Sequence, residues 1–96
     1  MDNRTDMIIL YDYYKELLTQ KQQDYFEGYY FENESLQELS EEFQVSRNAI
    51  HKQVKETEEK LLEYEKKLKL YEKRKQIMKL IEPLEENLKK EIEKRI

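Results

Sequence analysis

Five polar side chains near the middle of the chain have the types and spacing of a nucleic-acid contact. They follow or lie within the stretch QVSRNAIHKQV at residues 44–54, and they are Arg47, Asn48, His51, Lys52 and Lys55. On a helix that turns by about 100° per residue, all five fall within an arc of about 140°. Arg can hold guanine and Asn can hold adenine through two hydrogen bonds each, while Lys meets phosphate. The pattern predicts a surface that contacts DNA or RNA.

The other side of the same helix is apolar and must pack. Ile50 and Val54 lie there, and the preceding segment adds Leu39, Phe43 and Val45. These are the core positions of a helix-turn-helix, whose second helix can enter the major groove. A second interpretation stays open, in which the polar face only solvates the helix and the unit serves as a scaffold.

The charge of the chain is unevenly distributed around this motif. The formal net charge is −4, yet residues 44–55 carry +3 while residues 21–43 carry −6. Because phosphate attraction supplies most non-specific affinity, the acids before the motif predict weak or partner-assisted binding. A second basic stretch, residues 66–79, carries +6. It could follow phosphates, although lysine-rich helix faces usually only solvate.

The elements that must position these residues are helices, because Gly and Pro occur once each. Apolar spacing predicts a helix over about 5–18. Thr19 with Gln22 and Ser35 with Glu38 have capping-box spacing, so they predict helices from 20 and from 36 to about 43, with a loop over 31–34. Ser46 is the expected N-cap of the next helix. The fold class is therefore all-α.

The helix that begins at Arg47 is predicted to continue for more than thirty residues. Pro83 should bias Glu82 away from helical angles and start a last helix at its first position. We expect two parts: residues 1–57 as the helix-turn-helix domain, and residues 58–96 as a helical extension continuous with the recognition helix.

The extension carries more apolar surface than one neighbouring helix would bury. Its apolar residues alternate steps of three and four, as a paired helix requires, and a second line follows from Leu62, Leu70 and Ile77. The last helix, a second copy of the chain or another protein could cover them. We favour a homodimer.

The other reactive side chains give no sign of catalysis. His51 is the only histidine and has no recognisable second ligand or orienting partner, so a polar contact is favoured over a metal ligand or general base. Most of the tyrosines have helical spacing on apolar faces, which favours core packing over base stacking. We expect no enzyme activity, no cofactor and no metal.

Compartment and membrane association follow from composition. The chain has no cysteine, so disulfides and thiolate metal sites are excluded. Its longest apolar run near the start, MIILY at 7–11, is too short for a secretion signal or a membrane span. We expect a cytoplasmic protein without membrane insertion.

Residues 17–71 resemble the YlxM family of small bacterial proteins, whose helix-turn-helix is similar to sigma-factor region 4. The resemblance is carried by LT.KQ, YY, SL.E, VSRNAI and K.TE..L..YE.KL. It implies a helical domain of DNA-binding type, an extension that can dimerise, and a link to the signal recognition particle pathway. The chain departs from the family at Glu56, where a basic residue is usual, and in the turn, where Gln44 replaces Gly.

Two positions make local predictions that a structure can test. Gln44 either adopts left-handed angles at a cost of about 1 kcal/mol or belongs to a reshaped turn. Gly28 lies inside the second helix, where an apolar residue should serve better and glycine should cost about 0.5–1 kcal/mol.

The residues thus predict a regulatory protein of helix-turn-helix type that binds DNA or structured RNA. The alternative is a non-enzymatic helical adaptor whose extension binds a protein, such as a signal recognition particle component, with the helix-turn-helix as scaffold.

Overall fold

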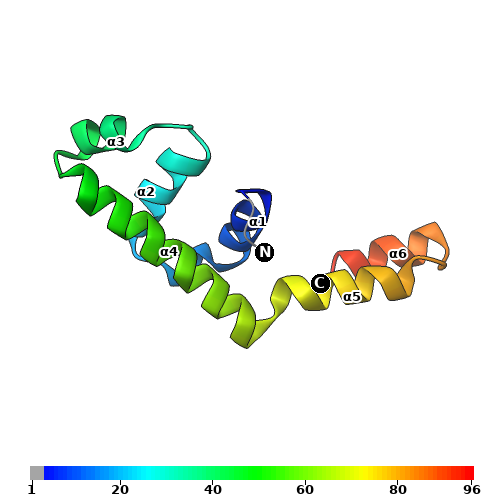
Figure 1. The fold of residues 1–96 in the computed structure, drawn as a ribbon. Helices are drawn as coiled ribbons and strands as arrows, with labels where there is room; N and C mark the ends of the chain where they lie inside the picture. Colours follow the sequence, from blue (N-terminus) through cyan, green and yellow to red (C-terminus); the bar gives the residue numbers. More distant parts are fainter. Residues whose placement is uncertain (1–3) are drawn as a thin grey trace.

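The computed structural model describes residues 4–96, and every regular element in that range is helical. The elements are α1 (Arg4–Tyr14), the 3-10 helix η1 (Lys15–Leu17), α2 (Gln20–Tyr30), α3 (Leu36–Phe43), α4 (Arg47–Leu68), α5 (Leu70–Ile81) and α6 (Glu86–Glu93). Figure 1 shows a bundle of α1–α4 from which α5 and α6 project as an arm. The all-α class, with a helix-turn-helix and a helical extension, is confirmed.

The expected N-terminal caps of the bundle helices are present. Thr19 and Ser35 each accept from the backbone N–H three residues on, and Gln22 and Glu38 accept in return from the backbone N–H of the cap. Ser46 accepts from Ala49 N at 3.0 Å. These side chains satisfy N–H groups that a helix start leaves unpaired, so the starts of α2, α3 and α4 are fixed locally.

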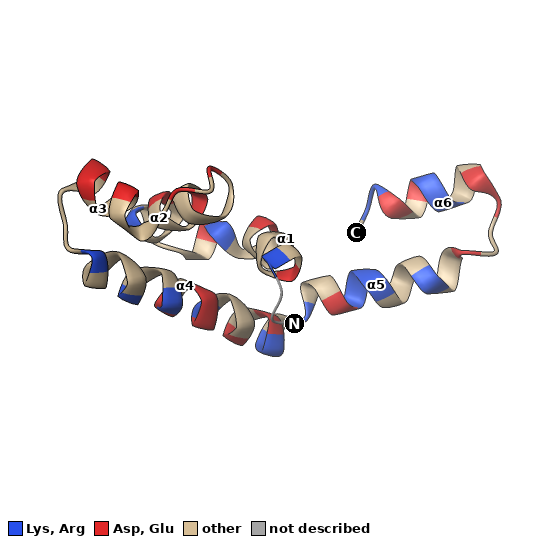
Figure 2. Cartoon of the chain, turned by 45° about the horizontal axis from the view of Figure 1, so that its top comes forward, with Lys and Arg blue, Asp and Glu red and all other residues tan. Residues whose placement is uncertain are grey.

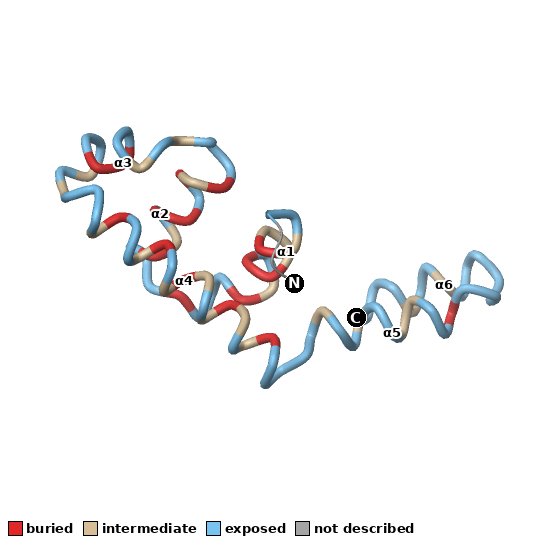
Figure 3. The backbone as a smooth tube through the Cα atoms, in the orientation of Figure 1, coloured by how far each residue is buried: buried red, intermediate tan, exposed pale blue. Residues whose placement is uncertain are grey.

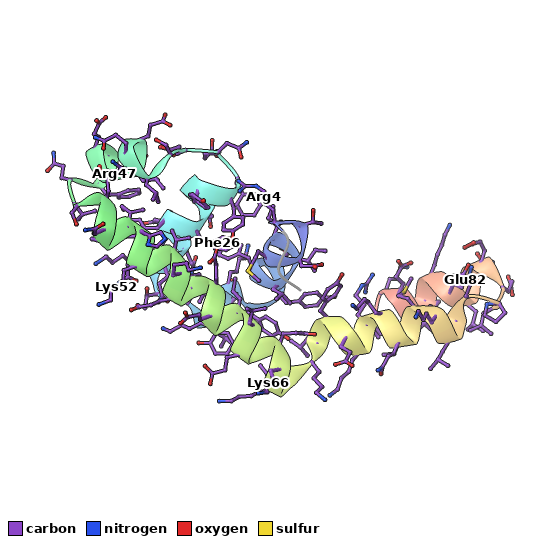
Figure 4. The ribbon with its side chains drawn as sticks, viewed as in Figure 1. Arg4, Phe26, Arg47, Lys52, Lys66 and Glu82 are labelled. Atoms are coloured by element: carbon purple, nitrogen blue, oxygen red, sulfur yellow. The ribbon has the colours of Figure 1, made fainter. Side chains whose placement is uncertain are left out.

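The core lies between α4 and the three helices packed on it. Phe26 is fully buried at its centre, and its ring stacks on Tyr11 and Tyr30 with centroids 4.4 and 4.3 Å apart (Figure 4). The core role predicted for the tyrosines is confirmed for Tyr11, Tyr14, Tyr25 and Tyr30, which are buried; Tyr29 is half-buried. Aromatic side chains therefore supply most of the buried volume of α1 and α2.

Gly28 has a packing role that corrects our expectation of an apolar residue there. A Cβ built at this position would lie 2.5 Å from Leu39 Cδ2, closer than real Cβ atoms come. Leu39 is fully buried. The glycine therefore lets α2 and α3 approach each other, and its cost in helix propensity is offset by that contact.

The prediction of one uninterrupted helix after Arg47 was wrong, because the chain bends at Lys69. Lys69 has left-handed angles (φ 56°, ψ 31°) and separates α4 from α5. The buried carboxylate of Glu65 accepts from Tyr71 N at 3.2 Å and from Glu72 N at 2.9 Å. Leu70 N donates to the Tyr14 hydroxyl, which donates to Glu65 Oε1 at 2.5 Å. This joint, made of Tyr14, Glu65 and the first backbone N–H groups of α5, caps the new helix.

The hydroxyl in the joint is held in its protonated form. Burial of Tyr14 and its hydrogen bond to Glu65 raise the pKa of the phenol to about 12. It can therefore donate to the carboxylate while it accepts from Leu70 N. The joint ties α1 to the start of the arm.

The end of the chain also differs from expectation. Pro83 lies in a turn, α6 begins only at Glu86, and Glu82 keeps right-handed helical angles (φ −48°, ψ −46°) as the C-cap of α5. Leu84 N donates to Ile81 O and closes the turn at 2.9 Å. The first helix is also shorter than expected, since α1 ends at Tyr14 and η1 follows it.

The arm is thin and mostly exposed. Helices α5 and α6 run back along each other as a hairpin, and Figure 3 shows most of their length as exposed. Ile81 is the one buried apolar residue of these two helices. The molecule measures 53 × 24 × 21 Å. No helix within residues 4–96 combines the length and the apolar character needed to cross a membrane.

Candidate nucleic-acid interface

The turn between α3 and α4 has the backbone of a helix-turn-helix despite its missing glycine. Gln44 adopts left-handed angles (φ 55°, ψ 47°), which is the first of the two alternatives left open by the sequence. Its N–H and that of Val45 both donate to Ser40 O, so α3 ends as it would with glycine. The turn is strained by about 1 kcal/mol but not reshaped.

Apolar contacts on both sides of this turn hold the two helices together. Leu39, Ile50 and Val54 are buried, as predicted for core positions of the motif, while Phe43 and Val45 are half-buried against the same core. The Phe43 ring meets Tyr25 edge-on, with centroids 4.9 Å apart. The packed side of α4 is thus fixed, and its opposite side must face outward.

All five predicted site residues lie on that outward side. Arg47, Asn48, His51, Lys52 and Lys55 are exposed over the first two and a half turns of α4. Figure 4 shows Lys52 on the side of α4 away from the other bundle helices, and Figure 2 shows basic residues along the outer edge of this helix. The structure therefore brings the five residues onto one continuous face, the α4 outer face.

The start of the α4 outer face is hollowed. Arg47, Asn48 and His51 line a shallow cavity of about 560 Å³ together with Leu36 and Ser46. Leu36 and Ser46 were not among our site residues, although their place at the start of α3 and at the cap of α4 could have indicated it. A hollow of this kind can admit a phosphate or a base edge next to the helix N-terminus.

The cations of this face differ in their surroundings. Lys55 Nζ lies 3.9 Å from Glu58, whose carboxylate also accepts from the Tyr30 hydroxyl. Arg47 and Lys52 form no ion pair with any residue in 4–96. The charge at Lys55 is thus partly balanced within the chain, whereas no ion pair within residues 4–96 balances the charges of Arg47 and Lys52.

Two acidic regions bound the α4 outer face. Glu59 follows Lys55 by one turn and is exposed, so the basic part of the helix ends there; its i+4 spacing was visible in the sequence. Glu38, Glu41 and Glu42 are exposed on α3, and Figure 2 shows acidic residues on this helix. A hydrogen bond with Glu42 raises the pKa of Glu34, an effect expected where carboxylates crowd. The positive charge of this face is thus confined to the first turns of α4.

Comparison with known proteins agrees with the helix-turn-helix geometry. A family profile described as "Putative helix-turn-helix protein, YlxM / p13 like" matches residues 1–96. The chain belongs to the UPF0122 family. A UPF0122 protein of Oceanobacillus iheyensis is 51% identical over 84 residues, which cover 88% of this chain and 80% of the relative. One from Listeria innocua is 48% identical over 84 residues, covering 88% and 76%. The resemblance seen in the sequence is confirmed.

The second basic stretch of this UPF0122 chain does not form one face. The bend at Lys69 separates Lys66 and Lys67 from the lysines of α5. Lys67 pairs with Glu63 at 2.8 Å, which raises the pKa of the amine. Arg74 is held by Glu93 at 3.5 Å and by Ile96 O at 3.2 Å. The basic residues of 66–79 therefore lie on two helices, α4 and α5, that run in different directions.

The possible metal ligands of the described residues do not gather into a cluster. No group of three or more His, Asp or Glu side chains among those residues could hold a metal ion. His51 is exposed beside Arg47 and Asn48, and within residues 4–96 no hydrogen bond or ion pair joins it to a carboxylate that would orient it as a base. In this UPF0122 chain the α4 outer face can form hydrogen bonds and ion pairs.

Proposed function

We propose that this UPF0122 protein is a regulatory protein that binds nucleic acid, DNA or structured RNA, through the α4 outer face. The observation that carries the proposal is the separation of five exposed polar residues from buried Ile50 and Val54 on a helix-turn-helix. Arg47 and Asn48 would anchor or read bases, His51 would add a polar contact, and Lys52 and Lys55 would neutralise phosphates.

We expect this binding to be weak or to need a partner. Glu38, Glu41 and Glu42 on α3 and Glu59 on α4 would repel a phosphate chain that extends beyond the basic turns. A component of the signal recognition particle pathway is the partner that we propose, on the strength of the resemblance to YlxM. In this proposal residues 1–57 are the binding domain and residues 58–96 are the extension that meets partners.

Removing two cations from the face tests the proposal. In fluorescence anisotropy with duplex DNA and with structured RNA, we expect salt-sensitive binding by the natural chain. Arg47→Ala with Lys52→Ala should weaken it, and the lost phosphate contact of Lys52 should lower the slope of log K against log salt by about 0.7 to 0.9.

A matched control removes the same charge far from the face. Lys90→Ala with Lys94→Ala, both exposed on the arm, should leave affinity and salt slope almost unchanged. Binding that shows no salt dependence, or that falls equally in both pairs of variants, would contradict the proposal.

An adaptor role for the arm is the second candidate. It is favoured by leucines that α5 and α6 leave in solvent: Leu80 is 76% exposed and Leu88 is 49% exposed. Such side chains commonly mark a protein interface. In this alternative the helix-turn-helix is scaffold, the chain is non-enzymatic, and the arm pairs with a second copy or with another protein.

A further inference from the structure

A groove lies where α1 faces α5, on a different part of the molecule from the α4 outer face. It has a volume of about 630 Å³. Four half-buried side chains form its apolar floor, Ile9 and Tyr13 from α1 and Tyr71 and Met78 from α5. The Tyr13 and Tyr71 rings lie side by side, with centroids 6.0 Å apart. The floor side chains are partly buried in the protein, and the groove above them is open to solvent.

The α5 wall of this groove is positively charged. Lys75 and Lys79 are exposed there, one helical turn apart. Lys75 Nζ lies 4.4 Å from the centre of the Tyr71 ring, which holds the ammonium over the floor. Arg74 also lines the groove, but Glu93 and Ile96 O occupy its guanidinium. Asp12 on α1 is the one carboxylate among the lining residues, so cations prevail.

The groove is formed before any ligand arrives. The Tyr14–Glu65 joint fixes the start of α5 against the end of α1, and Tyr13 and Tyr71 directly adjoin the joint residues. A site whose walls are already held in place loses little entropy when it binds, so even a small interface can be productive.

We propose that the α1/α5 groove binds an amphipathic helix of another protein. Leucine-like side chains of that helix would fill the floor, and two carboxylates one turn apart would pair with Lys75 and Lys79. The proposal does not depend on the function of α4.

The chemistry of the groove disfavours two other occupants. A nucleic acid could stack bases on the two tyrosine rings of the floor, but the aliphatic Ile9 and Met78 beside them offer it neither stacking nor hydrogen bonds, whereas leucine-like side chains can cover all four. A second copy of this chain would offer α6, whose exposed stripe is flanked by Lys89 and Lys90 as well as by glutamates. An acidic helix fits both the floor and the charge.

The methionines provide a site-specific measurement. Met78 lies on the floor, while Met7 is buried in the core and serves as an internal reference. The probe is a synthetic helix of about 18 residues, long enough to be helical, with leucines on one face and glutamates beside them. In ¹³C-methyl NMR the peptide should shift the Met78 signal and leave the Met7 signal unmoved. The Met78 shift should be smaller at high salt. The same peptide with lysine for each glutamate should not bind.

A pair of charge reversals isolates the cationic wall. Lys75→Glu with Lys79→Glu should weaken binding of the acidic peptide at least about tenfold, because like charges would then face each other. Lys73→Glu with Lys90→Glu makes the same change of net charge at exposed residues outside the groove and should keep the affinity. If the first pair disturbs folding by circular dichroism, Lys75→Gln with Lys79→Gln replaces it.

Several outcomes would overturn the proposal. One is an acidic peptide that leaves the Met78 signal unshifted, and another is a lysine peptide that binds equally well. A third is an equal loss of affinity for the acidic peptide in the two pairs of charge reversals. A shift of Met78 with protein concentration alone that persists after Leu80→Lys with Leu88→Lys, which removes two exposed leucines of the arm, would assign the groove to a second copy. A shift with structured RNA in place of the peptide would assign it to nucleic acid.

Discussion

At Gly28 the absence of a side chain allows close packing of two helices in this small bundle. Its backbone lies against Leu39, so that a single methyl group would overlap Leu39 Cδ2. From the sequence we expected this glycine only to destabilise α2, because helix propensity depends on the residue itself and not on its contacts in the fold. The contact that requires it joins α2 to α3 and is visible only in three dimensions.

Gly28→Ala should therefore destabilise the fold, although alanine is the better helix former. We expect the free energy of unfolding to fall by about 1–3 kcal/mol, the usual cost of overpacking a core. Urea denaturation followed by circular dichroism measures it. In a Leu39→Val background the same substitution should cost less, because a smaller side chain relieves the overlap. An alanine variant more stable than the natural chain would refute the packing role.

The candidate site was predictable at the level of single residues. The helical period alone separated Arg47, Lys52 and their neighbours from Ile50 and Val54, and the structure keeps that separation. The period could not show that Glu58 lies beside Lys55 and also binds the Tyr30 hydroxyl, since that arrangement depends on the packing of α2 against α4.

The sequence did not reveal where the joint between α4 and α5 lies. Nothing in residues 60–80 interrupts a helix by composition, yet the chain bends where a carboxylate can cap the next helix. Tyr14 completes this cap from 51 residues away in the sequence. The caps at Thr19, Ser35 and Ser46 were predictable because their partners lie three residues on, within one turn.

Glu65→Gln should loosen the joint. The neutral amide offers one acceptor oxygen where the carboxylate offers two, so one N–H at the start of α5 loses a charge-assisted partner. We expect a loss of about 1.5–3 kcal/mol in unfolding free energy. Hydrogen exchange of the Tyr71 and Glu72 amides should accelerate.

Glu63→Gln is the matched control for that substitution. Glu63 lies two residues away on the exposed side of α4 and, among residues 4–96, pairs only with Lys67, so its loss should cost about 0–1 kcal/mol. If the two variants exchange and unfold alike, the joint does not hold α5 in place.

At the scale of the whole molecule, the arm leaves apolar surface without a partner in the described structure. A two-helix hairpin that buries one apolar side chain gains little stability from its own packing. We propose that two copies pair through α5 and α6, which would bury Leu80, Leu84 and Leu88 in a four-helix arrangement.

Analytical ultracentrifugation tests this pairing. The natural chain should sediment as a dimer at tens of micromolar, and Leu80→Lys with Leu88→Lys should convert it to a monomer, because both side chains are exposed on the arm. Leu17→Lys, which changes a leucine of similar exposure on the bundle, should remain dimeric. A natural chain that stays monomeric at that concentration would rule out the proposed pairing.

The straight run of α4 between Lys52 and Glu65 couples the two ends of the molecule. Thirteen residues at about 1.5 Å each place them roughly 20 Å apart, and each residue turns the helix by about 100°. Inserting a single amino acid there would swing the arm a quarter-turn or more around the bundle while moving it barely at all along the axis. The number of residues in α4 thus sets the rotation of the arm about the helix axis relative to the bundle. Insertions that keep this rotation unchanged must lie outside α4.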